Sequence, residues 1–181
     1  TLIIDSSNIT SSEVDEEYVR KMRSSIILMG AMIGRLDYTK ISYPGGCAIG
    51  SRPIDLHLKA LKKLGVRIEE ENGFIKCYKD KLQGNIINLE FPSVGATENA
   101  ILAAVKANGI TKIYNAAREP EIIDLQNFLN RMGAKICGAG TNQIKIIGVK
   151  KLNKVNYNIM PDRIETGTFL CMAAITNGKV I

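Results

Sequence analysis

The sequence predicts an α/β fold built from similar units, each combining helices with short strands. Two sets of positions recur along the chain at nearly the same interval. The first set recurs 68 positions later, with Leu61, Leu64, Gly65 and Ile68 matched by Leu129, Met132, Gly133 and Ile136. The second set recurs 69 positions later, with residues 104–109 matched by residues 173–178. This interval is too long for the common solenoid repeats and indicates α/β modules packed around shared helices.

The first unit contains two helix patterns. Residues 18–33 alternate charged and apolar positions and then become apolar, which predicts a helix buried over its later half. Residues 54–64 carry apolar side chains at helical spacing, with Pro53 before them and Gly65 as a stop signal. Three short strands are predicted next, the first two flanking an acidic turn, at residues 66–68, 73–77 and 85–89.

The second unit repeats this order of elements. A helix of small residues is predicted to end at Asn108-Gly109, and residues 122–132 predict a second helix that Gly133 stops. A strand pair follows at residues 134–136 and 143–147. The chain opens in an apolar, strand-like run and stops where another strand is due, so we expect a piece of a longer protein.

The composition is that of a folded globular chain. It has 181 residues, 45% of them hydrophobic and 23% charged, with a mean hydropathy of +0.01. A chain of this size buries roughly 70% of its unfolded surface. No run approaches the roughly 18 apolar residues that span a bilayer, and residues 1–5 lack a signal-peptide pattern. We therefore expect a cytoplasmic protein without a membrane partner.

Cysteine and histidine are too scattered to indicate a metal site. The single histidine is His57, and no two of the four cysteines form a C-x-x-C pair. We expect reduced thiols, no metal and no cofactor. Three cysteines lie within apolar runs and are expected in the core: Cys77, Cys137 and Cys171.

The net charge of +6 suits either a nucleic acid or a small anionic substrate drawn into a basic cleft. Lysine and arginine are scattered rather than gathered in a stripe, and only 6% of residues are aromatic and able to stack on bases. The distribution favours the small anionic substrate and no nucleic-acid partner.

The most informative segment is a loop rich in glycine at residues 43–53. The Gly45-Gly46 pair allows unusual backbone conformations and close approach of a ligand, and it leaves Cys47 projecting from the loop. Cations nearby in the sequence, such as Arg52, favour the thiolate form of such a cysteine. A reactive thiol and an inert small residue in a turn are both compatible with Cys47.

Three polar residues stand at the start of the helix that follows. Arg52 and the free N–H groups of the helix start together suit a phosphate. Asp55 either accepts from N–H groups of a ligand or only stabilises the first helical turn. His57 lies on the polar side of this helix, where a solvated imidazole is expected more often than a catalytic one.

Three further helix entrances carry polar residues. Ser93, Val94 and Gly95 precede the helix of small residues and offer a hydroxyl and free N–H groups, suited to phosphate or to capping alone. Residues 118–121 and 161–165 occupy similar entrances, where their charges either serve a site or only cap helices and bridge modules.

Residues 44–57, which read Pro-Gly-Gly-Cys-Ala-Ile-Gly-Ser-Arg-Pro-Ile-Asp-Leu-His, resemble the catalytic-loop signature of the UDP-N-acetylglucosamine 1-carboxyvinyltransferases. Three further segments resemble this family in order and spacing, at residues 93–97, 115–121 and 161–168. The resemblance covers essentially the whole chain. Phe91-Pro92 departs from it, because some members have a lysine and a valine there.

The resemblance implies a fold of two domains, each of three βαβαββ units around buried helices, as in the inside-out α/β barrel of the enolpyruvyl transferase type. Residues 1–157 would belong to the domain with the cysteine loop, incomplete at its N-terminus. Residues 158–181 would begin a second, truncated domain. The complete enzyme would be more than twice as long.

The implied reaction transfers the enolpyruvyl group of phosphoenolpyruvate to the 3-hydroxyl of UDP-N-acetylglucosamine and releases phosphate. It commits the sugar nucleotide to peptidoglycan, and so serves cell-wall biogenesis, cell shape and cell division. Cys47 matches the loop cysteine that donates a proton to the enolpyruvyl methylene and is alkylated by fosfomycin. The resemblance therefore implies phosphoenolpyruvate, UDP-N-acetylglucosamine and fosfomycin as binding partners.

The remaining site residues follow from the same resemblance. Arg52 matches an arginine near the phosphates of both substrates, and Arg23 matches a second ligand-facing arginine. The wall around the uracil is matched by Pro53, Ile54, Asp55 and Leu56. The turn beside the diphosphate is matched by Ser93, Val94 and Gly95.

Some groups of the family have no counterpart in these residues, among them a Lys-Asn pair that holds phosphoenolpyruvate and an aspartate proposed as general base. We therefore expect negligible turnover from the 181 residues alone. Two alternatives stay open. One is an enolpyruvyl transferase of the same fold acting on shikimate 3-phosphate, and the other is a non-catalytic paralogue that binds sugar nucleotides.

Overall fold

The structure is a computed structural model that describes residues 1–46, 50 and 52–180. Its second unit shows the repeat most completely. In chain order it consists of β4 (Ile86–Asn88), α4 (Val94–Ala104), β5 (Ile110–Tyr114), α5 (Pro120–Arg131), β6 (Lys135–Cys137) and β7 (Gln143–Ile147). β4 pairs with β5 in parallel, and the other pairs are antiparallel, which gives the strand order β4-β5-β7-β6. This is a βαβαββ unit.

The first unit has the same plan. It consists of α1 (Glu16–Lys21), the 3₁₀ helix η1 (Arg23–Ile27), α2 (Leu28–Arg35), β1 (Tyr38–Ser42), α3 (Asp55–Lys63), β2 (Arg67–Glu71) and β3 (Phe74–Tyr78). Its strand order is β1-β3-β2, and a parallel bridge from Glu13 to Lys40 stands where β4 stands in the second unit. The predicted repeat is confirmed.

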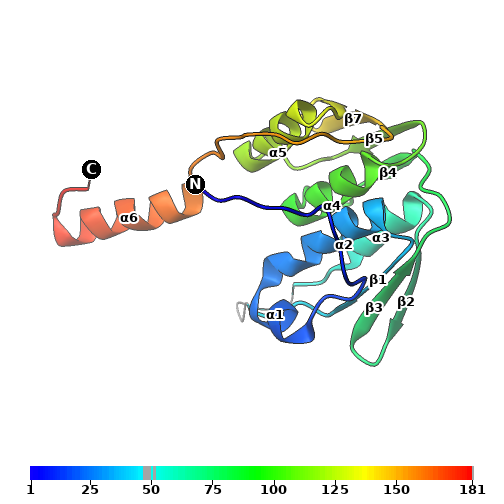
Figure 1. Ribbon diagram of the computed structural model, residues 1–181. Coiled ribbons are helices and arrows are strands. Elements are labelled where there is room, and N and C mark those ends of the chain that lie inside the picture. Colours follow the sequence, from blue (N-terminus) through cyan, green and yellow to red (C-terminus); the bar gives the residue numbers. More distant parts are fainter. Residues whose placement is uncertain (47–49, 51, 181) are drawn as a thin grey trace.

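Helices fill the space between the two sheets. Figure 1 shows α2, α3 and α4 in the middle of the molecule, with β1, β2 and β3 on one side and β4, β5 and β7 on the other. The α4 helix is made of small residues, and seven of its eleven residues are buried. Small side chains allow neighbouring helices to approach it closely, so α4 is the centre of the core.

The predicted helix at residues 18–33 is wrong as one element, because the structure divides it into α1, η1 and α2. An extended residue, Met22, separates α1 from η1, and the junction between η1 and α2 has a side-chain cause. In a continuous helix the N–H of Gly30 would bond to the carbonyl of Ile26, four residues earlier. Instead Asn99 accepts from the N–H of Gly30 at 2.6 Å and donates to the carbonyl of Ile26 at 2.9 Å. A side chain inserted between such partners interrupts a helix.

Two strands were not predicted, although their sequences carry the signal. β1 and β5 both alternate buried and less buried residues, which is the period of a strand with one face on a core. The acidic turn was also placed too early, because β2 continues to Glu71 and the chain reverses at Asn72-Gly73, both with positive φ.

The cysteine predictions are confirmed in one case and wrong in two. Cys77 on β3 is fully buried, and burial raises the pKa of its thiol to about 12. Cys137 and Cys171 are exposed instead. Cys137 follows the inward-facing Ile136 on a strand, so it must face outward. Cys171 lies on α6 (Arg163–Thr176), none of whose residues is buried.

The two ends of the described chain lie away from the core. In Figure 1, α6 projects from the body of the molecule and carries exposed apolar residues such as Leu170 and Ile175. Leu2, Ile3 and Ile4 are also exposed, and the strand-like run predicted at the start forms no strand in the described residues. None of the described helices has the length and apolar character needed to cross a bilayer.

The contact between α2 and α4 gives a stability prediction. A Cβ atom at Gly30 would lie 2.3 Å from the backbone oxygen of Asn99, whereas one at Gly34 would meet its nearest neighbours at an ordinary 3.4 Å. We expect Gly30→Ala to lower the free energy of unfolding by about 2–3 kcal/mol, because the two backbones must separate. Urea denaturation measures this change.

Gly34→Ala on the same helix is the matched control. It adds the same methyl group where space exists, so helix propensity should make it neutral or stabilising by up to about 1 kcal/mol. Equal losses for the two variants would contradict the close approach at Gly30.

Candidate functional site

The predicted site residues fall at the starts of three helices. Cys47 lies outside the described residues, so its predicted role stays a prediction. Arg52 and Pro53 are exposed just before α3, and Asp55 is its first residue. The side chains of Ile54 and Leu56 are buried in the core. The side chains of these two residues therefore anchor the helix start in the core. In this conformation only their backbone groups can face a ligand.

The start of η1 reaches the segment before α3. Arg23 is half-buried, and its guanidinium donates a hydrogen bond to the carbonyl oxygen of Arg52. This bond holds two positively charged residues side by side, although 29 positions separate them in the sequence. The guanidinium of Arg23 is thereby fixed near the start of α3, and a fixed cation at a helix start favours an anion.

The start of α3 is also tied to the segment before α4. Lys59 bridges two carboxylates, with its Nζ 3.4 Å from Asp55 Oδ2 and 2.5 Å from Glu90 Oε1. Asp55 thus stabilises the first turn of α3, one of the two roles considered for it. The bridge is exposed, so it positions these segments more than it stabilises them.

The start of α4 is capped as the sequence suggested. Ser93 Oγ accepts from the N–H of Ala96 at 3.3 Å, and its carbonyl accepts from the hydroxyl of Thr97 at 2.8 Å. Thr97 Oγ1 in turn accepts from the N–H of Ala117 at 3.1 Å. Capping therefore accounts for the Ser93 hydroxyl.

His57 is buried, with 7% of its surface exposed, so the expectation of a solvated imidazole is wrong. Its Nδ1 lies 3.0 Å from the amide nitrogen of Asn99. The other bonds of Asn99 fix its amide nitrogen as a donor, so Nδ1 must accept and the ring proton sits on Nε2. His57 lies on the polar face of α3, and this face contacts a polar residue of α4, Asn99.

The same histidine touches the start of α4. A Cβ atom at Gly95 would lie 2.9 Å from Cε1 of His57, so only glycine leaves the imidazole room at this point. His57 therefore stands between the start of α3, with Arg52 and Asp55, and the start of α4, with Ser93 and Gly95.

Burial and charge keep His57 neutral. Burial first, and the positive charge of Arg23 second, lower its pKa from 6.5 to about 4, although Asp55 acts in the opposite direction. Protonation would also place a donor at Nδ1 against the amide donor of Asn99. At neutral pH His57 therefore adds no positive charge beside these helix starts.

Glu98, a residue of α4 that sequence analysis did not select, has the opposite shift. Partial burial, and then the nearby carboxylate of Glu121, raise its pKa from 4.5 to about 7. No local sequence pattern marks this residue, because its environment depends on how α5 packs beside α4.

The other charged helix entrances cap and bridge. Asp162 caps α6 by accepting from the N–H of Ile164 at 2.8 Å. Arg163 forms a two-pronged ion pair with Glu121, at 2.9 and 3.0 Å, that joins α6 to α5. Glu121 opens α5 immediately after Pro120. Asp162, Arg163 and Glu121 thus make the capping and bridging contacts that the sequence analysis considered for these entrances.

Taken together, the helix starts form a region suited to a phosphate-bearing ligand. The free N–H groups at the starts of α3 and α4 and the guanidinium groups of Arg23 and Arg52 all favour negative charge. Within the described residues, no group of three or more His, Cys, Asp or Glu side chains could hold a metal ion.

A family comparison agrees with this fold. A sequence model of the family described as EPSP synthase (3-phosphoshikimate 1-carboxyvinyltransferase) matches residues 1–181, the whole chain. The chain belongs to the EPSP synthase family. The enolpyruvyl transferase fold predicted from the sequence is therefore confirmed.

Curated relatives of the chain have a more specific name than the family does. The chain is 60% identical over 179 residues to UDP-N-acetylglucosamine 1-carboxyvinyltransferase 2 of Caldanaerobacter subterraneus subsp. tengcongensis, which covers 99% of the chain and 43% of the relative. It is 58% identical over 179 residues to the protein of that name from Clostridium tetani, with the same two shares. The chain thus spans less than half the length of these relatives.

Solved structures of family members share the fold. The enolpyruvyl transferase NikO from Streptomyces tendae superposes with a TM-score of 0.76 at 22% identity, over 89% of this chain and 38% of that one. EPSP synthase from Acinetobacter baumannii gives 0.63 at 23% identity, over 84% and 34%.

The buried imidazole predicts a pH effect on stability. Between pH 6.5 and about 4 the unfolded chain binds a proton at His57 that the native state does not, so stability falls as pH falls through this window. The full loss is about 3 kcal/mol. His57→Asn keeps an acceptor near Nδ1 and does not titrate, so the fall should be smaller by this amount in urea titrations. An unchanged fall would contradict the neutral, buried imidazole.

Glu98 predicts the reverse effect in an overlapping window. Its native pKa is raised, so its contribution is favourable at low pH and is lost as pH rises from 4.5 through about 7. Because the side chain is only partly buried, we expect Glu98→Gln to stabilise the protein by roughly 1 kcal/mol near pH 8 and by nothing near pH 4. The same urea titrations test this. A gain independent of pH would exclude ionisation as its cause.

Proposed function

We propose that this chain is part of an enzyme that transfers the enolpyruvyl group of phosphoenolpyruvate to the 3-hydroxyl of UDP-N-acetylglucosamine. The observation that carries the proposal is the set of relatives at 54–60% identity over nearly the whole chain, all named for this activity. The anion-favouring helix starts support it, because both substrates carry phosphate.

The proposed chemistry is an addition followed by an elimination. In the addition, the sugar hydroxyl bonds to C2 of phosphoenolpyruvate and gives up its proton, while C3 gains a proton and the C2–C3 double bond becomes single. In the elimination, C3 loses a proton, the C2–C3 double bond re-forms and the C2–O bond to phosphate breaks. The proton lost by the sugar hydroxyl leaves with the phosphate. Cys47 is proposed as the donor of the proton to C3, and Arg23 and Arg52 as the groups that hold phosphate charge. No cofactor is required.

Binding of the sugar nucleotide is assigned to the backbone and side chains around the starts of α3 and α4. Pro53, Ile54, Asp55 and Leu56 are proposed to form the uracil wall. Ser93, Val94 and Gly95 are proposed to lie beside the diphosphate. His57 is then a positioning residue, because it packs against Gly95 and against Asn99 beneath the site.

We also propose a domain boundary after residue 157. Tyr157 still packs on the body of the molecule, since its hydroxyl donates to Asp124 Oδ1 at 2.7 Å and its ring meets Phe128 at 5.3 Å between centroids. Ile159 is already exposed, and α6 contains no buried residue. Residues 158–181 are therefore assigned to a second domain.

The cellular role follows from the proposed reaction. Enolpyruvyl transfer to UDP-N-acetylglucosamine would commit this sugar nucleotide to peptidoglycan, and through it to cell-wall biogenesis, cell shape and cell division. A cytoplasmic location is proposed, because both substrates are soluble phosphorylated metabolites. Neither a nucleic acid nor a membrane is proposed as partner.

Alkylation by fosfomycin is the test of the proposed site. We expect the full-length protein that carries this chain to gain one adduct on Cys47. The adduct should form faster when UDP-N-acetylglucosamine is present, because Cys47 is proposed to react while the sugar nucleotide occupies the site. Intact-mass spectrometry followed by peptide mapping measures the adduct. Cys137, which is exposed on β6, serves as an internal control that should stay unmodified.

Substrate specificity is tested separately by phosphate release from the same full-length protein. Release should require UDP-N-acetylglucosamine, and Cys47→Ala should lower it by about 10²-fold or more. Turnover with shikimate 3-phosphate alone would overturn the assignment in favour of the other enolpyruvyl transferase. Binding of the sugar nucleotide without turnover would favour a non-catalytic paralogue.

A further inference from the structure

The sheet of the second unit has an outer face that no described element covers. Along β5 and β7, Ile113, Ile144 and Ile146 are buried against the helices, and the alternate residues Lys112 and Lys145 point the other way. On the outer face three isoleucines are 39–51% exposed: Ile86, Ile110 and Ile147. The face therefore presents both cationic and apolar side chains.

The strand register arranges these side chains in two rows. In the first row, Lys112 on β5 lies directly opposite Lys145 on β7. This lysine pair is flanked by Ile86 on β4 and by Cys137 on β6. Two residues further along the strands, Ile110 lies opposite Ile147, which in turn lies opposite Lys135. Residues two apart on a strand are separated by roughly 7 Å, so a row that holds the lysine pair runs beside a row that holds the isoleucine pair.

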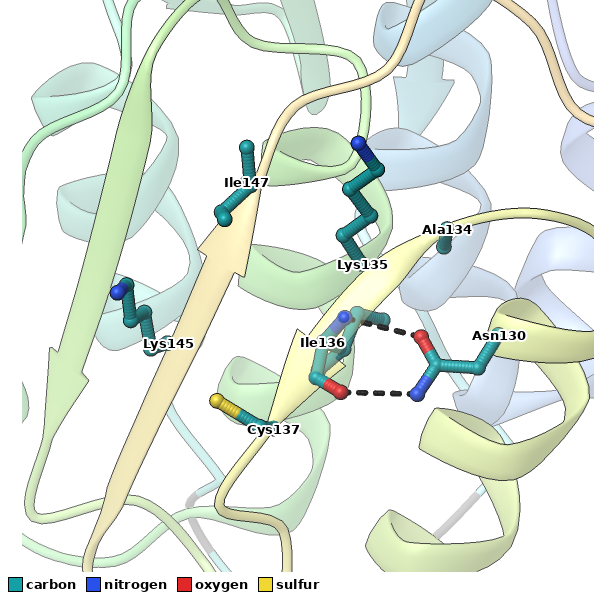
Figure 2. Close-up of a pocket in the computed structure, with 7 residues that line it drawn as sticks. All are labelled: Asn130, Ala134, Lys135, Ile136, Cys137, Lys145 and Ile147. Atoms are coloured by element: carbon teal, nitrogen blue, oxygen red, sulfur yellow. Dashed lines mark hydrogen bonds between the residues drawn. The ribbon is translucent and has the colours of Figure 1, made fainter.

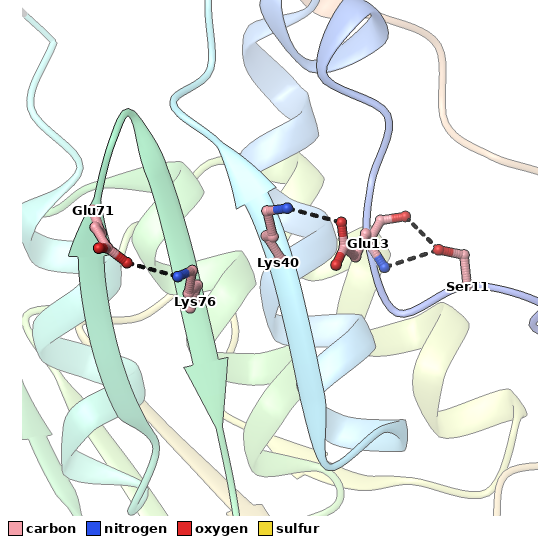
Figure 3. Close-up of polar contacts among 5 residues, drawn as sticks. All are labelled: Ser11, Glu13, Lys40, Glu71 and Lys76. Carbon is pink, nitrogen blue, oxygen red and sulfur yellow. Dashed lines mark hydrogen bonds and ion pairs between the residues drawn. The ribbon is translucent and has the colours of Figure 1, made fainter.

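The first unit carries an equivalent lysine pair but neutralises it. Lys40 on β1 lies directly opposite Lys76 on β3, as Lys112 on β5 lies opposite Lys145 on β7. Figure 3 shows the difference: Lys40 Nζ lies 2.9 Å from Glu13, and Lys76 Nζ lies 2.7 Å from Glu71. Each lysine of the first sheet thus has its own carboxylate.

The second sheet supplies no such carboxylates. Within the part of the chain that the structure describes, no ion pair involves Lys112, Lys135 or Lys145. Residues 105–157 contain nine Lys or Arg and three Asp or Glu, so this stretch accounts for the whole net charge of +6. Like charges directly opposite on neighbouring strands destabilise a sheet, so this pair is a cost that the fold itself does not offset.

The geometry also limits how a partner can bind. Figure 2 shows a shallow hollow at β6 and β7, lined by Lys135, Cys137, Lys145 and Ile147. At the free edge of β6, Asn130 donates to the carbonyl of Ile136 at 2.8 Å and accepts from its N–H at 2.9 Å. An added strand would need these backbone groups. The partner therefore lies on the face of the sheet and does not extend it.

We propose that this outer face is a docking surface for an extended acidic peptide segment of a partner protein, with carboxylates over Lys112 and Lys145 and apolar side chains over Ile110 and Ile147. Alternate residues of an extended peptide are also roughly 7 Å apart, so one peptide spans both rows. The apolar row favours a peptide over a nucleic acid or a lipid headgroup. This surface is independent of the enolpyruvyl transfer proposed above.

The test uses a fluorescein-labelled peptide of repeated Glu-Ser-Leu-Ser units and fluorescence anisotropy. We expect saturable binding that weakens with salt and falls about tenfold in Lys112→Gln/Lys145→Gln. The matched variant Lys40→Gln/Lys76→Gln removes the same charge from the first sheet and should bind as the parent does. Lys112→Arg/Lys145→Arg keeps the charge and should retain binding. Thermal melting confirms that each variant is folded.

Several outcomes would overturn the proposal. Equal losses in the two Gln variants would show that only net charge matters. Tighter binding of a labelled single-stranded oligonucleotide, or of vesicles containing anionic lipid, would assign the face to another class of partner. Unchanged binding in Ile147→Ser would remove the role of the apolar row. Absence of saturable peptide binding would remove the surface altogether.

Discussion

The fold depends on one buried side-chain amide, that of Asn99 on α4. Its oxygen accepts the N–H of Gly30 and its nitrogen donates to the carbonyl of Ile26, two groups that a continuous helix would join directly. Without this amide the buried N–H of Gly30 would lose its partner, and an unsatisfied buried group costs about 1–3 kcal/mol. The amide thereby sets where α2 begins and how closely α2 approaches α4. This close approach requires a glycine at position 30.

The same amide connects the core to the candidate site. It fixes the tautomer of His57, and His57 fills the space between the starts of α3 and α4. Keeping this imidazole neutral prevents a buried positive charge close to Arg23. Arg23 and Arg52 then provide positive charge, and the helix starts provide free N–H groups. The packing of three helices and the electrostatics of the site therefore have one structural origin.

Much of the fold could be predicted, because each unit repeats local signals such as Gly65 and Gly133 after a helix. What could not be predicted depends on partners distant in sequence. The break before α2 is caused by a residue 69 positions from Gly30, and the burial of His57 by one 42 positions away. For the candidate site, the sequence pointed to the helix starts and to charges at residues 118–121 and 161–165 that could bridge modules. It did not reveal Asn99, or that Ile54 and Leu56 face the core.

The most direct measurement compares Asn99→Leu with Asn130→Leu by urea denaturation. Both asparagines make two hydrogen bonds to backbone groups, but those of Asn99 are buried, whereas those of Asn130 lie at a sheet edge and are only partly buried. We expect Asn99→Leu to lower the free energy of unfolding by about 4 kcal/mol, because buried groups lose their partners. Asn130→Leu should lower it by about 1 kcal/mol. Equal losses for the two variants, or a smaller loss for Asn99→Leu, would show that the fold does not depend on the side-chain amide of Asn99.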